Sequence, residues 1–513
     1  MLLIVDFVSQ VTQLIARRIR ELNVYCEIVS WEKDIFKIAT ERETAAIILS
    51  GGPESTTAAK SPTVSKKIFN LNIPILGICY GHQLLCKLLG GKVHKSTKRE
   101  FGRAFVTKTT TSKISLLEGL FKDGTEKVWM SHGDGVSRMP KNFISLAKSH
   151  NTDFAIIGDL KKKFFGIQFH PEVFHTQNGT LFFRNFLRIS KINANWTPNK
   201  ITEKLIGDLK SGIGKEKVLC ALSGGVDSSV TALLLSKAIG NNLTCIFVDN
   251  GLLRKNEAKD IIILFKKHFK IKLIVVNAKK LFLTSLKDIS DPEKKRKLIG
   301  KLFIEIFEQQ AEKLKGIKFL AQGTLYPDVI ESTSVHGKSS HTIKSHHNVG
   351  GLPKKMNLKL VEPLRSLFKD EVRKIGFTLG LDKQFIQRHP FPGPGLAIRC
   401  PGEISNRKID ILREVDHVFV TQLKKHKLYN KIWQALAIVL PVKSVGVMGD
   451  TRTHEFACVL RAVNSTDGMT ADFFYFNKDF LSETSNRIIN EIKGVNRVLF
   501  DITSKPPGTI EWE

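Results

Sequence analysis

The sequence predicts an α/β protein with two open, mostly parallel-sheet domains followed by a smaller α+β domain. Apolar strand-like runs alternate with helical stretches over residues 1–192, and a second set of the same kind occupies residues 193–388. Such alternation is typical of parallel sheets whose strands are connected by helices. Residues 389–513 mix helices and strands without that regularity. The length of 513 residues allows about three domains.

In the first domain, four apolar runs have the length of buried strands. They cover residues 2–5, 46–49, 73–78 and 164–168. Residues 13–22 have the period of an amphipathic helix. The N-terminal run is interrupted by Asp6 and has no basic leader, so we expect a first strand and no secretion signal. The polar residues 193–199 are typical of a linker.

The second domain repeats this pattern. Its expected strands cover residues 217–222, 243–249 and 319–322. A helix should begin near Ser228. The run of proline and glycine at residues 389–395 should end the domain, because these residues interrupt regular structure.

The net charge of +30 is the one extreme value of the composition. It is compatible with nucleic-acid binding or with lysines on solvated faces. The lysines are scattered in ones, twos and threes, as at Lys294 and Lys295, without a basic tail or an RNA-binding motif. We therefore expect solvated lysines and no specific nucleic-acid partner.

The use of cysteine and the length of the apolar runs indicate in which cellular compartment the protein is expected. The seven cysteines are scattered and form no C-x-x-C pair, which argues against a disulfide framework or a zinc site. Apolar stretches such as residues 435–441 are shorter than the ~18–20 residues that a membrane span needs. We expect a cytoplasmic protein with no membrane contact.

A cysteine follows the third apolar run of the first domain in the pattern G-x-C-x-G, centred on Cys79. Flanking glycines allow a tight strand-to-helix turn, as in a nucleophile elbow. A helix N-terminus also favours the thiolate form of a cysteine. The alternative is a buried cysteine packed at the end of a strand, and the motif alone leaves both interpretations open.

Two further segments favour a catalytic site. His170 follows the strand at residues 164–168, and Glu172 lies two residues on, as suits a base and the group that orients it. Residues 50–53 follow another strand and could direct a backbone N–H at an oxyanion. Ends of parallel strands are where open α/β sheets carry their sites, so a Cys-His-Glu acyl-transfer site is predicted.

These segments resemble the class I glutamine amidotransferase family. The resemblance implies that Cys79 is the nucleophile, His170 the base and Glu172 the orienting carboxylate, with the backbone N–H groups of Gly52 and Tyr80 forming the oxyanion hole. His132 also matches a family segment, and it could line the site or be a loop histidine with local hydrogen bonds. Val8 departs from the family's usual glycine and Val11 from its usual tyrosine.

A phosphate-binding segment follows the first strand of the second domain. Its glycines permit a nest of backbone N–H groups at a helix N-terminus, and its serines add donors. Asp227 could hold Mg²⁺. The lysine of a Walker loop is absent. The segment consists of Ser223, Gly224, Gly225, Val226, Asp227, Ser228 and Ser229.

That segment resembles the PP-loop of ATP pyrophosphatases, which convert ATP into an adenylylated substrate and pyrophosphate. The resemblance implies that ATP is a co-substrate bound by this loop, with the nucleoside near Asp249. Displacement of AMP by ammonia would then join the two predicted sites in one reaction.

Over its whole length the chain resembles the glutamine-hydrolysing GMP synthetase family, which has the order glutaminase, PP-loop ATPase, dimerisation domain. The matching segments cover residues 320–332, 343–353, 388–399, 446–453 and 505–513. The resemblance implies glutamine, ATP and XMP as substrates, Mg²⁺ as cofactor and a homodimer formed through residues 389–513. It places XMP on Arg399, Lys505, Thr509, Ile510 and Glu511, and a lid over the substrates on Lys344, His346 and His347.

Three alternatives are less favoured. A metal site at His336, His341, His346 and His347 has neither helical nor zinc-site spacing, so we expect no zinc, and no flavin. An RNA-modifying PP-loop enzyme would use the positive charge but not a glutaminase domain. A non-catalytic binding protein would not need the intact site residues.

Overall fold

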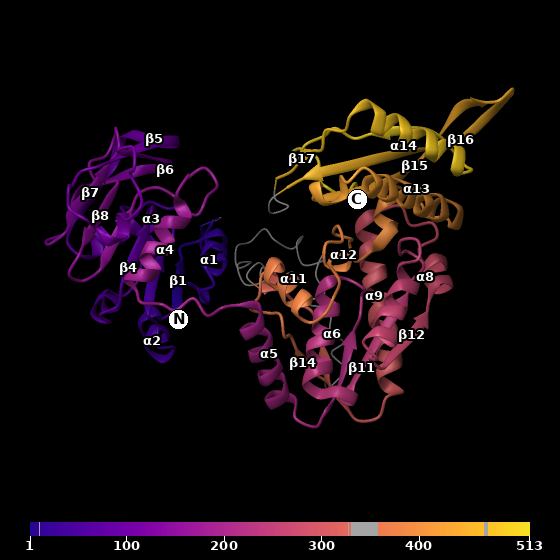
Figure 1. Ribbon diagram of the computed structural model, residues 1–513, viewed down its shortest axis with the longest axis horizontal. Helices are drawn as coiled ribbons and strands as arrows, with labels where there is room; N and C mark the ends of the chain where they lie inside the picture. The colour runs from indigo at the N-terminus through magenta and orange to yellow at the C-terminus, as the bar shows by residue number, and fades with distance from the viewer. Residues whose placement is uncertain (10, 327, 330–357, 466–469) are drawn as a thin grey trace. The chain divides into compact units, whose positions relative to one another are not determined.

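The computed structural model describes residues 1–9, 11–326, 328–329, 358–465 and 470–513. The chain divides into two compact units, residues 1–200 and 201–513 (Figure 1). The predicted architecture of two mostly parallel sheets followed by a smaller α+β part is confirmed. None of the helices in the described part of the chain has the length and apolar character needed to span a membrane.

The first unit is built on a nine-stranded sheet in the order β2-β1-β3-β4-β9-β8-β7-β5-β6. The first five strands in this order are parallel, and the remaining ones pair antiparallel. The strands are β1 (Leu2–Asp6), β2 (Cys26–Ser30), β3 (Ala46–Leu49), β4 (Ile75–Ile78), β5 (Lys92–Lys108), β6 (Thr125–Arg138), β7 (Ile144–Lys148), β8 (Ile156–Asp159) and β9 (Phe164–Ile167). The helices are α1 (Thr12–Glu21), α2 (Ile35–Glu41), α3 (Tyr80–Leu88) and α4 (Gly179–Ile189).

The apolar runs of the sequence become the centre of this sheet. Strands β3, β4 and β9 are buried at every residue, as expected of parallel strands covered on both faces. Helix α1 buries Ile15, Ala16 and Ile19 on one face, because these positions recur at the helical period.

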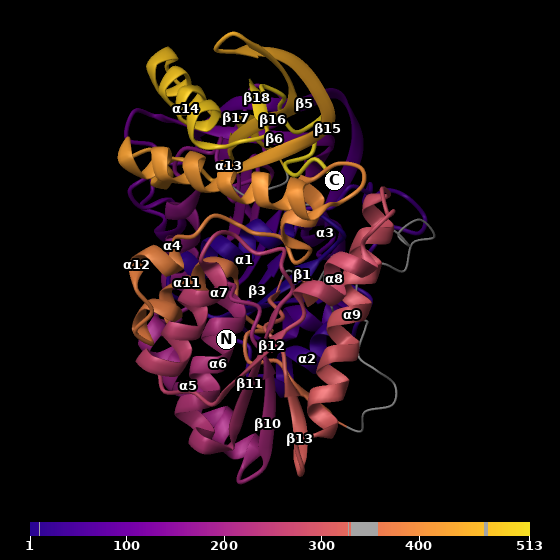
Figure 2. The same ribbon diagram turned by 90° about the vertical axis from the view of Figure 1, so that its right-hand side faces the viewer.

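The second unit contains a five-stranded parallel sheet in the order β12-β11-β10-β13-β14. In Figure 2, α6 and α9 lie on opposite sides of this sheet. The strands are β10 (Lys217–Ala221), β11 (Leu243–Asp249), β12 (Leu273–Asn277), β13 (Ile317–Ala321) and β14 (Lys359–Val361). The helices are α5 (Pro198–Ile213), α6 (Val226–Ile239), α7 (Glu257–Ile262), α8 (Lys279–Ser285), α9 (Pro292–Glu312), α11 (Lys369–Thr378) and α12 (Lys383–Ile386).

The C-terminal part of this unit has a mixed four-stranded sheet packed against two helices (Figure 1). Two of its strands form a long hairpin. The elements are α13 (Asn406–Lys425), β15 (Gln434–Met448), β16 (Thr451–Asn464), β17 (Asp472–Phe473), α14 (Lys478–Glu491) and β18 (Val495–Phe500).

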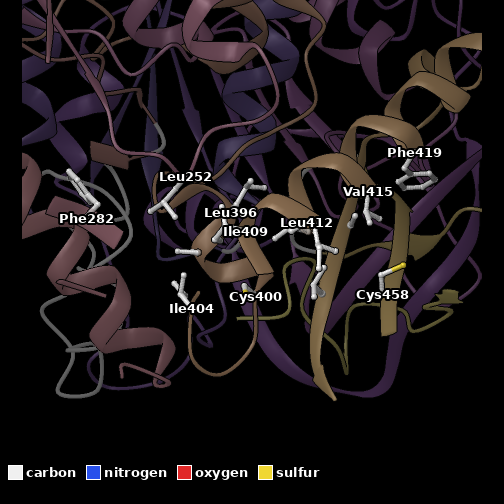
Figure 3. Close-up of a cluster of buried hydrophobic side chains, with 14 of the residues drawn as sticks. Leu252, Phe282, Leu396, Cys400, Ile404, Ile409, Leu412, Val415, Phe419 and Cys458 are labelled. Atoms are coloured by element: carbon white, nitrogen blue, oxygen red, sulfur yellow. The ribbon is translucent and has the colours of Figure 1, made fainter. Parts of the chain in front are cut away.

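One cluster of buried apolar side chains joins the two sheets of the second unit. It runs from Leu219 and Ile246 on the parallel sheet to Leu412 and Val415 on α13 and Cys458 on β16, and Figure 3 shows part of it. Because this core is continuous, residues 201–513 form one compact unit. The division at residues 192 and 388 into three domains stays a prediction.

Candidate active sites

The cysteine motif forms a tight turn between β4 and α3. Cys79 is buried and has φ +50°, a left-handed conformation that is uncommon for a residue with a side chain. A Cβ at Gly77 would lie 2.4 Å from the Gly81 carbonyl oxygen, and one at Gly81 would lie 2.2 Å from the Leu49 carbonyl oxygen. The two glycines are therefore needed for the turn, which holds the thiol at the end of the sheet.

His170 and Glu172 form a buried pair on the loop after β9. The imidazole Nδ1 lies 2.8 Å from the Glu172 carboxylate, and the Glu172 side chain is completely buried. The loop is fixed to its neighbours: the His170 N–H donates to the Trp129 carbonyl at 3.0 Å, and Thr176 donates to the His170 carbonyl at 2.5 Å. The ring is therefore held in one orientation.

The charge of His170 depends on its two polar neighbours. Burial alone would lower the pKa of His170, but hydrogen bonds to the Cys79 side chain and to Glu172 outweigh it and raise this pKa to about 11. The imidazole is thus protonated at neutral pH. A protonated imidazole beside a sulfur favours the nucleophilic thiolate.

The loop after β3 lies against His170 and against Tyr80, the residue that follows Cys79. A Cβ at Gly51 would lie 3.1 Å from Cε1 of His170, and one at Gly52 would lie 3.3 Å from Cγ of Tyr80. The loops after β3, β4 and β9 therefore meet at one point. The structure brings together Cys79, His170, Glu172, Gly52 and Tyr80, the residues that the sequence placed in this site.

Two side chains near the cysteine, Gln168 and Gln83, were not assigned from the sequence, whereas His132 was predicted either to line the site or to be a loop histidine. Gln168 Nε2 lies 3.9 Å from the Cys79 sulfur, and Gln83 Nε2 donates to the Asp134 carbonyl at 2.9 Å. His132 lies on β6 and not in a loop, and its Nε2 lies 3.1 Å from the buried Glu100 carboxylate. Gln83 lies on α3, four residues after Cys79. This spacing places it on the same face of the helix as the cysteine, so the sequence alone could have predicted that Gln83 lies near the site.

The phosphate-binding segment forms the turn between β10 and α6. Gly224 has φ +84°, where glycine is favoured. The hydroxyl groups of Ser223 and Ser228 lie 2.9 Å apart, and Ser229 donates to the Gly225 carbonyl at 2.8 Å. These hydroxyl contacts stabilise the turn. The turn lies at the N-terminus of a 14-residue helix, a position that attracts anions.

Asp227 stands in the first turn of α6. Its Oδ2 pairs with Lys369 at the start of α11, and its Oδ1 is buried without a hydrogen-bond partner among the described residues. A Cβ at Gly323 would lie 3.1 Å from the backbone of Asp227, so the loop after β13 closes tightly on this turn. Lys369 lies 142 residues from Asp227, and nothing in the sequence indicated this contact.

Asp249 ends β11, the parallel neighbour of β10. Its Oδ1 accepts the Gly251 N–H at 3.1 Å, and its Oδ2 lies 3.2 Å from the Lys279 ammonium. Because the carboxyl ends of neighbouring parallel strands share one edge of the sheet, Asp249 lies on the same edge as the phosphate-binding turn.

The C-terminal segment is anchored by two buried arginines. Arg399 binds Glu511 with both Nε and Nη2, at 3.0 and 2.8 Å. Burial alone would lower the pKa of Arg399, but the charge of Glu511 raises it above its ordinary value. Arg461 donates to the carbonyls of Ile510 and Thr509, each at 2.9 Å. The tail is therefore ordered, and Arg399, Thr509, Ile510 and Glu511 lie together.

The remaining predicted residues are Lys505, which is described, and the lid residues and histidines, which are not. The backbone of Lys505 pairs with Ala471 in a short bridge, with N···O distances of 2.7 and 3.0 Å. The predicted lid residues Lys344, His346 and His347, and the histidines at 336 and 341, lie outside the described residues.

The fold and these sites define a class of protein. A cysteine elbow with a histidine–carboxylate pair on an open α/β sheet is joined in one chain to a second α/β sheet with a PP-loop, as in glutamine amidotransferases that use ATP.

Comparison with known proteins gives the same class and a particular family. Residues 3–189 match the model described as glutamine amidotransferase class-I, residues 216–275 match tRNA methyl transferase HUP domain, and residues 421–512 match GMP synthase C terminal domain. The chain is 57% identical over 513 residues to the glutamine-hydrolyzing GMP synthases of Ruegeria sp. and Dinoroseobacter shibae, covering 100% of this chain and 98% of each relative. The chain belongs to the family of glutamine-hydrolysing GMP synthases.

It is therefore a glutamine-dependent, ATP-using ligase of GMP biosynthesis. The short HUP match covers residues 216–275, which include the PP-loop segment, and the full-length matches give no support to an RNA-modifying enzyme. Among solved structures, the chain is similar to a glutamine amidotransferase from Thermotoga maritima at 21% identity, covering 40% of this chain and 84% of that chain with a TM-score of 0.26, too low for a structural argument.

Proposed function

We propose that Cys79, His170 and Glu172 are the catalytic triad of glutamine hydrolysis, and that the ammonia released there converts XMP to GMP. The observation that carries the proposal is the buried contact of His170 with Glu172 at 2.8 Å beside a cysteine held in an elbow. Burial lowers the pKa of His170, but hydrogen bonds to the Cys79 side chain and to Glu172 outweigh it and raise this pKa to about 11, which supports a protonated imidazole beside the cysteine.

In the first half-reaction, the Cys79 sulfur attacks the side-chain amide carbon of glutamine. His170 donates a proton to the departing nitrogen, ammonia leaves, and a glutamyl thioester remains on the sulfur. Water activated by His170 then hydrolyses the thioester to glutamate. Glu172 keeps the ring oriented, and the N–H groups of Gly52 and Tyr80 stabilise the oxyanion of each tetrahedral intermediate.

In the second half-reaction, the C2 oxygen of XMP attacks the α-phosphorus of ATP and pyrophosphate leaves. Ammonia adds to C2 of the adenylylated XMP, the C2–O bond breaks, and AMP and GMP are the products. The backbone N–H groups and hydroxyls of residues 223–229 hold the phosphates at the start of α6. Asp249, on the same sheet edge, contacts the nucleoside of ATP.

The PP-loop also fits a Mg²⁺ ion. The Oδ1 atom of Asp227 is buried and has no hydrogen-bond partner in the described part of the chain, and a carboxylate oxygen is a ligand that Mg²⁺ prefers. Mg²⁺ bound with ATP would supply positive charge at the departing pyrophosphate. Lys369 pairs with the other oxygen of Asp227, so its positive charge also lies at the PP-loop.

The XMP site is proposed on the C-terminal tail. Lys505 suits the XMP phosphate as a point charge, and Glu511 can accept from ring N–H or ribose hydroxyl groups. Arg399 holds Glu511 in place, with Thr509 and Ile510 alongside. A lid that includes Lys344, His346 and His347 stays part of the proposal.

A homodimer through residues 389–513 and a cytoplasmic location also belong to the proposal. Support for a dimer comes from three exposed valines of β15, Val442, Val445 and Val447, with 59–74% of their surface accessible. Exposed apolar surface on a long strand is typical of contact with another chain. Support for a reducing cytoplasm comes from the seven free, buried cysteines.

The experiment incubates the full chain with ATP, Mg²⁺, glutamine and either XMP or deamido-NAD, and separates the nucleotides by chromatography. We expect GMP, AMP and glutamate in equal amounts with XMP and no AMP with deamido-NAD. AMP formed with deamido-NAD but not with XMP would refute the substrate assignment.

A further inference from the structure

Lys295 is a fully buried lysine in the first turn of helix α9. The scattered lysines, Lys294 and Lys295 among them, were expected to be solvated; this expectation is wrong for Lys295, whereas Lys294 is exposed. Burial of an ammonium group is costly unless it is paired, and the N-terminus of a helix disfavours positive charge. A lysine in this position must be compensated by specific contacts.

Those contacts join two segments that are distant in the sequence. The Lys295 ammonium donates to the Cys400 carbonyl at 2.9 Å and to the Ala397 carbonyl at 3.4 Å. These two residues lie on either side of Arg399. The same ammonium binds the Glu513 carboxylate at 2.6 Å. Lys295 therefore holds the turn that carries Arg399 and the tail that carries Glu511.

The last residue is held by two further groups. The second carboxylate oxygen of Glu513 accepts the Gly402 N–H at 3.1 Å, and Arg296 donates to the main-chain oxygen of Glu513. Two residues before it, Glu511 accepts from Gln434 at 2.6 Å in addition to its double contact with Arg399. The tail is thus fixed at Glu513 and again at Glu511.

We propose that Lys295 is a positioning residue for the XMP site, acting through Glu513 and the turn at Arg399 to fix the orientation of Glu511 toward the substrate. This inference rests on the proposed placement of XMP at the C-terminal tail. Loss of the ammonium removes the donor from one carboxylate oxygen of Glu513 and from two buried carbonyls, so the turn and the tail lose one of the contacts that join them. The PP-loop has no contact with Lys295 among the described residues, so ATP binding is unaffected.

The test is steady-state kinetics of the full chain with ammonium as nitrogen source, which makes the glutaminase site irrelevant. XMP is varied at saturating ATP, and ATP is varied at saturating XMP. Lys295→Met and Glu513→Gln should each raise the KM for XMP roughly tenfold or more, since small displacements of positioned groups have effects of this order. The KM for ATP should stay within about twofold of the parent value.

The neighbouring lysine supplies a matched control. Lys294→Met removes the same charge from an exposed side chain and should leave both KM values unchanged. The double variant Lys295→Met/Glu513→Gln should be no worse than Lys295→Met alone, because the contact between Lys295 and Glu513 is already lost in that single variant. Glu513→Gln is the milder change and decides the question if Lys295→Met does not fold.

Two outcomes overturn the inference. An unchanged KM for XMP in Glu513→Gln and in folded Lys295→Met would show that the anchor does not act on the XMP site. Parallel rises in the KM for XMP and for ATP would show a general structural role. Glu511→Gln and Lys505→Ala distinguish failure of this inference from failure of the proposed function. If these two variants raise the KM for XMP while Lys295→Met and Glu513→Gln do not, only the positioning role of Lys295 fails. If Glu511→Gln and Lys505→Ala also have no effect, the XMP site lies elsewhere.

Discussion

At the scale of single residues, the glutaminase site depends on a strained backbone. Cys79 adopts φ +50° and is held there because Gly77 and Gly81 allow backbone atoms to approach closely on both sides. Strain of this kind is maintained at sites where a side chain must be presented in a fixed position. The thiol is consequently next to His170 without any rearrangement.

Replacement of the nucleophile should separate the two half-reactions. Cys79→Ala should abolish GMP formation with glutamine, because no other side chain there can form the thioester. Synthesis with ammonium salts should stay near the parent rate, since adenylylation occurs at the PP-loop. Initial rates with each nitrogen source give the answer. Retained glutamine-dependent activity would mean that another residue is the nucleophile.

Val8 is a second strained residue near this site. It adopts φ +66°, which is costly for a β-branched side chain, and its side chain is mostly exposed. Val8→Gly should raise the free energy of unfolding by about 1 kcal/mol, the strain of about 1–2 kcal/mol less the added entropy of glycine. Urea denaturation measures the change.

The matched control is Val8→Ile, which keeps the branched Cβ and should leave the free energy of unfolding unchanged. A Val8→Gly variant that is less stable than the parent protein would show that the valine side chain makes contacts worth more than the strain.

Some of these residues could be found from the sequence and others could not. Cys79, His170 and Glu172 follow buried strands, and parallel strands bring their carboxyl ends together. The environment of Lys295 could not be predicted, because its partner Glu513 lies 218 residues away and adjacent lysines have the same local pattern. The contact between Asp227 and Lys369 was missed for the same reason.

At the scale of secondary-structure elements, the junction of β10 and α6 is the proposed site of the ATP chemistry. Asp227→Asn should reduce ammonium-dependent GMP synthesis at least ~100-fold, because the variant loses negative charge where Mg²⁺ and pyrophosphate meet. Rate measurements at several Mg²⁺ concentrations test this. Asp208→Asn, an exposed change on α5, is the control and should have no effect. Near-normal activity of Asp227→Asn would assign the metal to another group.

The sequence predicted strands correctly where the strand is buried on both faces of its sheet. The runs that became β1, β3, β4, β9, β10 and β11 are apolar on both faces, and their expected bounds differ from the observed ones by no more than two residues. The long strands β5 and β6 were missed. Their sequences are rich in charged and polar residues, and the described residues of β5 are largely exposed, so both strands lack the apolar runs that identify buried strands.

At the scale of the whole molecule, the chain has two units with separate cores, and one of the two proposed half-reactions is assigned to each unit. Relatives that match over the full length at 57% identity are glutamine-hydrolyzing GMP synthases, so both units belong to the chain that defines the family. The charge of +30 comes largely from lysines that are scattered along the whole sequence.

The central claim is that the amide nitrogen of glutamine becomes the amino nitrogen of GMP in this one chain. The most direct measurement supplies the protein with XMP, ATP, Mg²⁺ and glutamine labelled with ¹⁵N in its amide group, and determines the mass of the nucleotide product. We predict GMP that carries one ¹⁵N atom, together with AMP and glutamate. Labelled ammonium without labelled GMP would contradict the account.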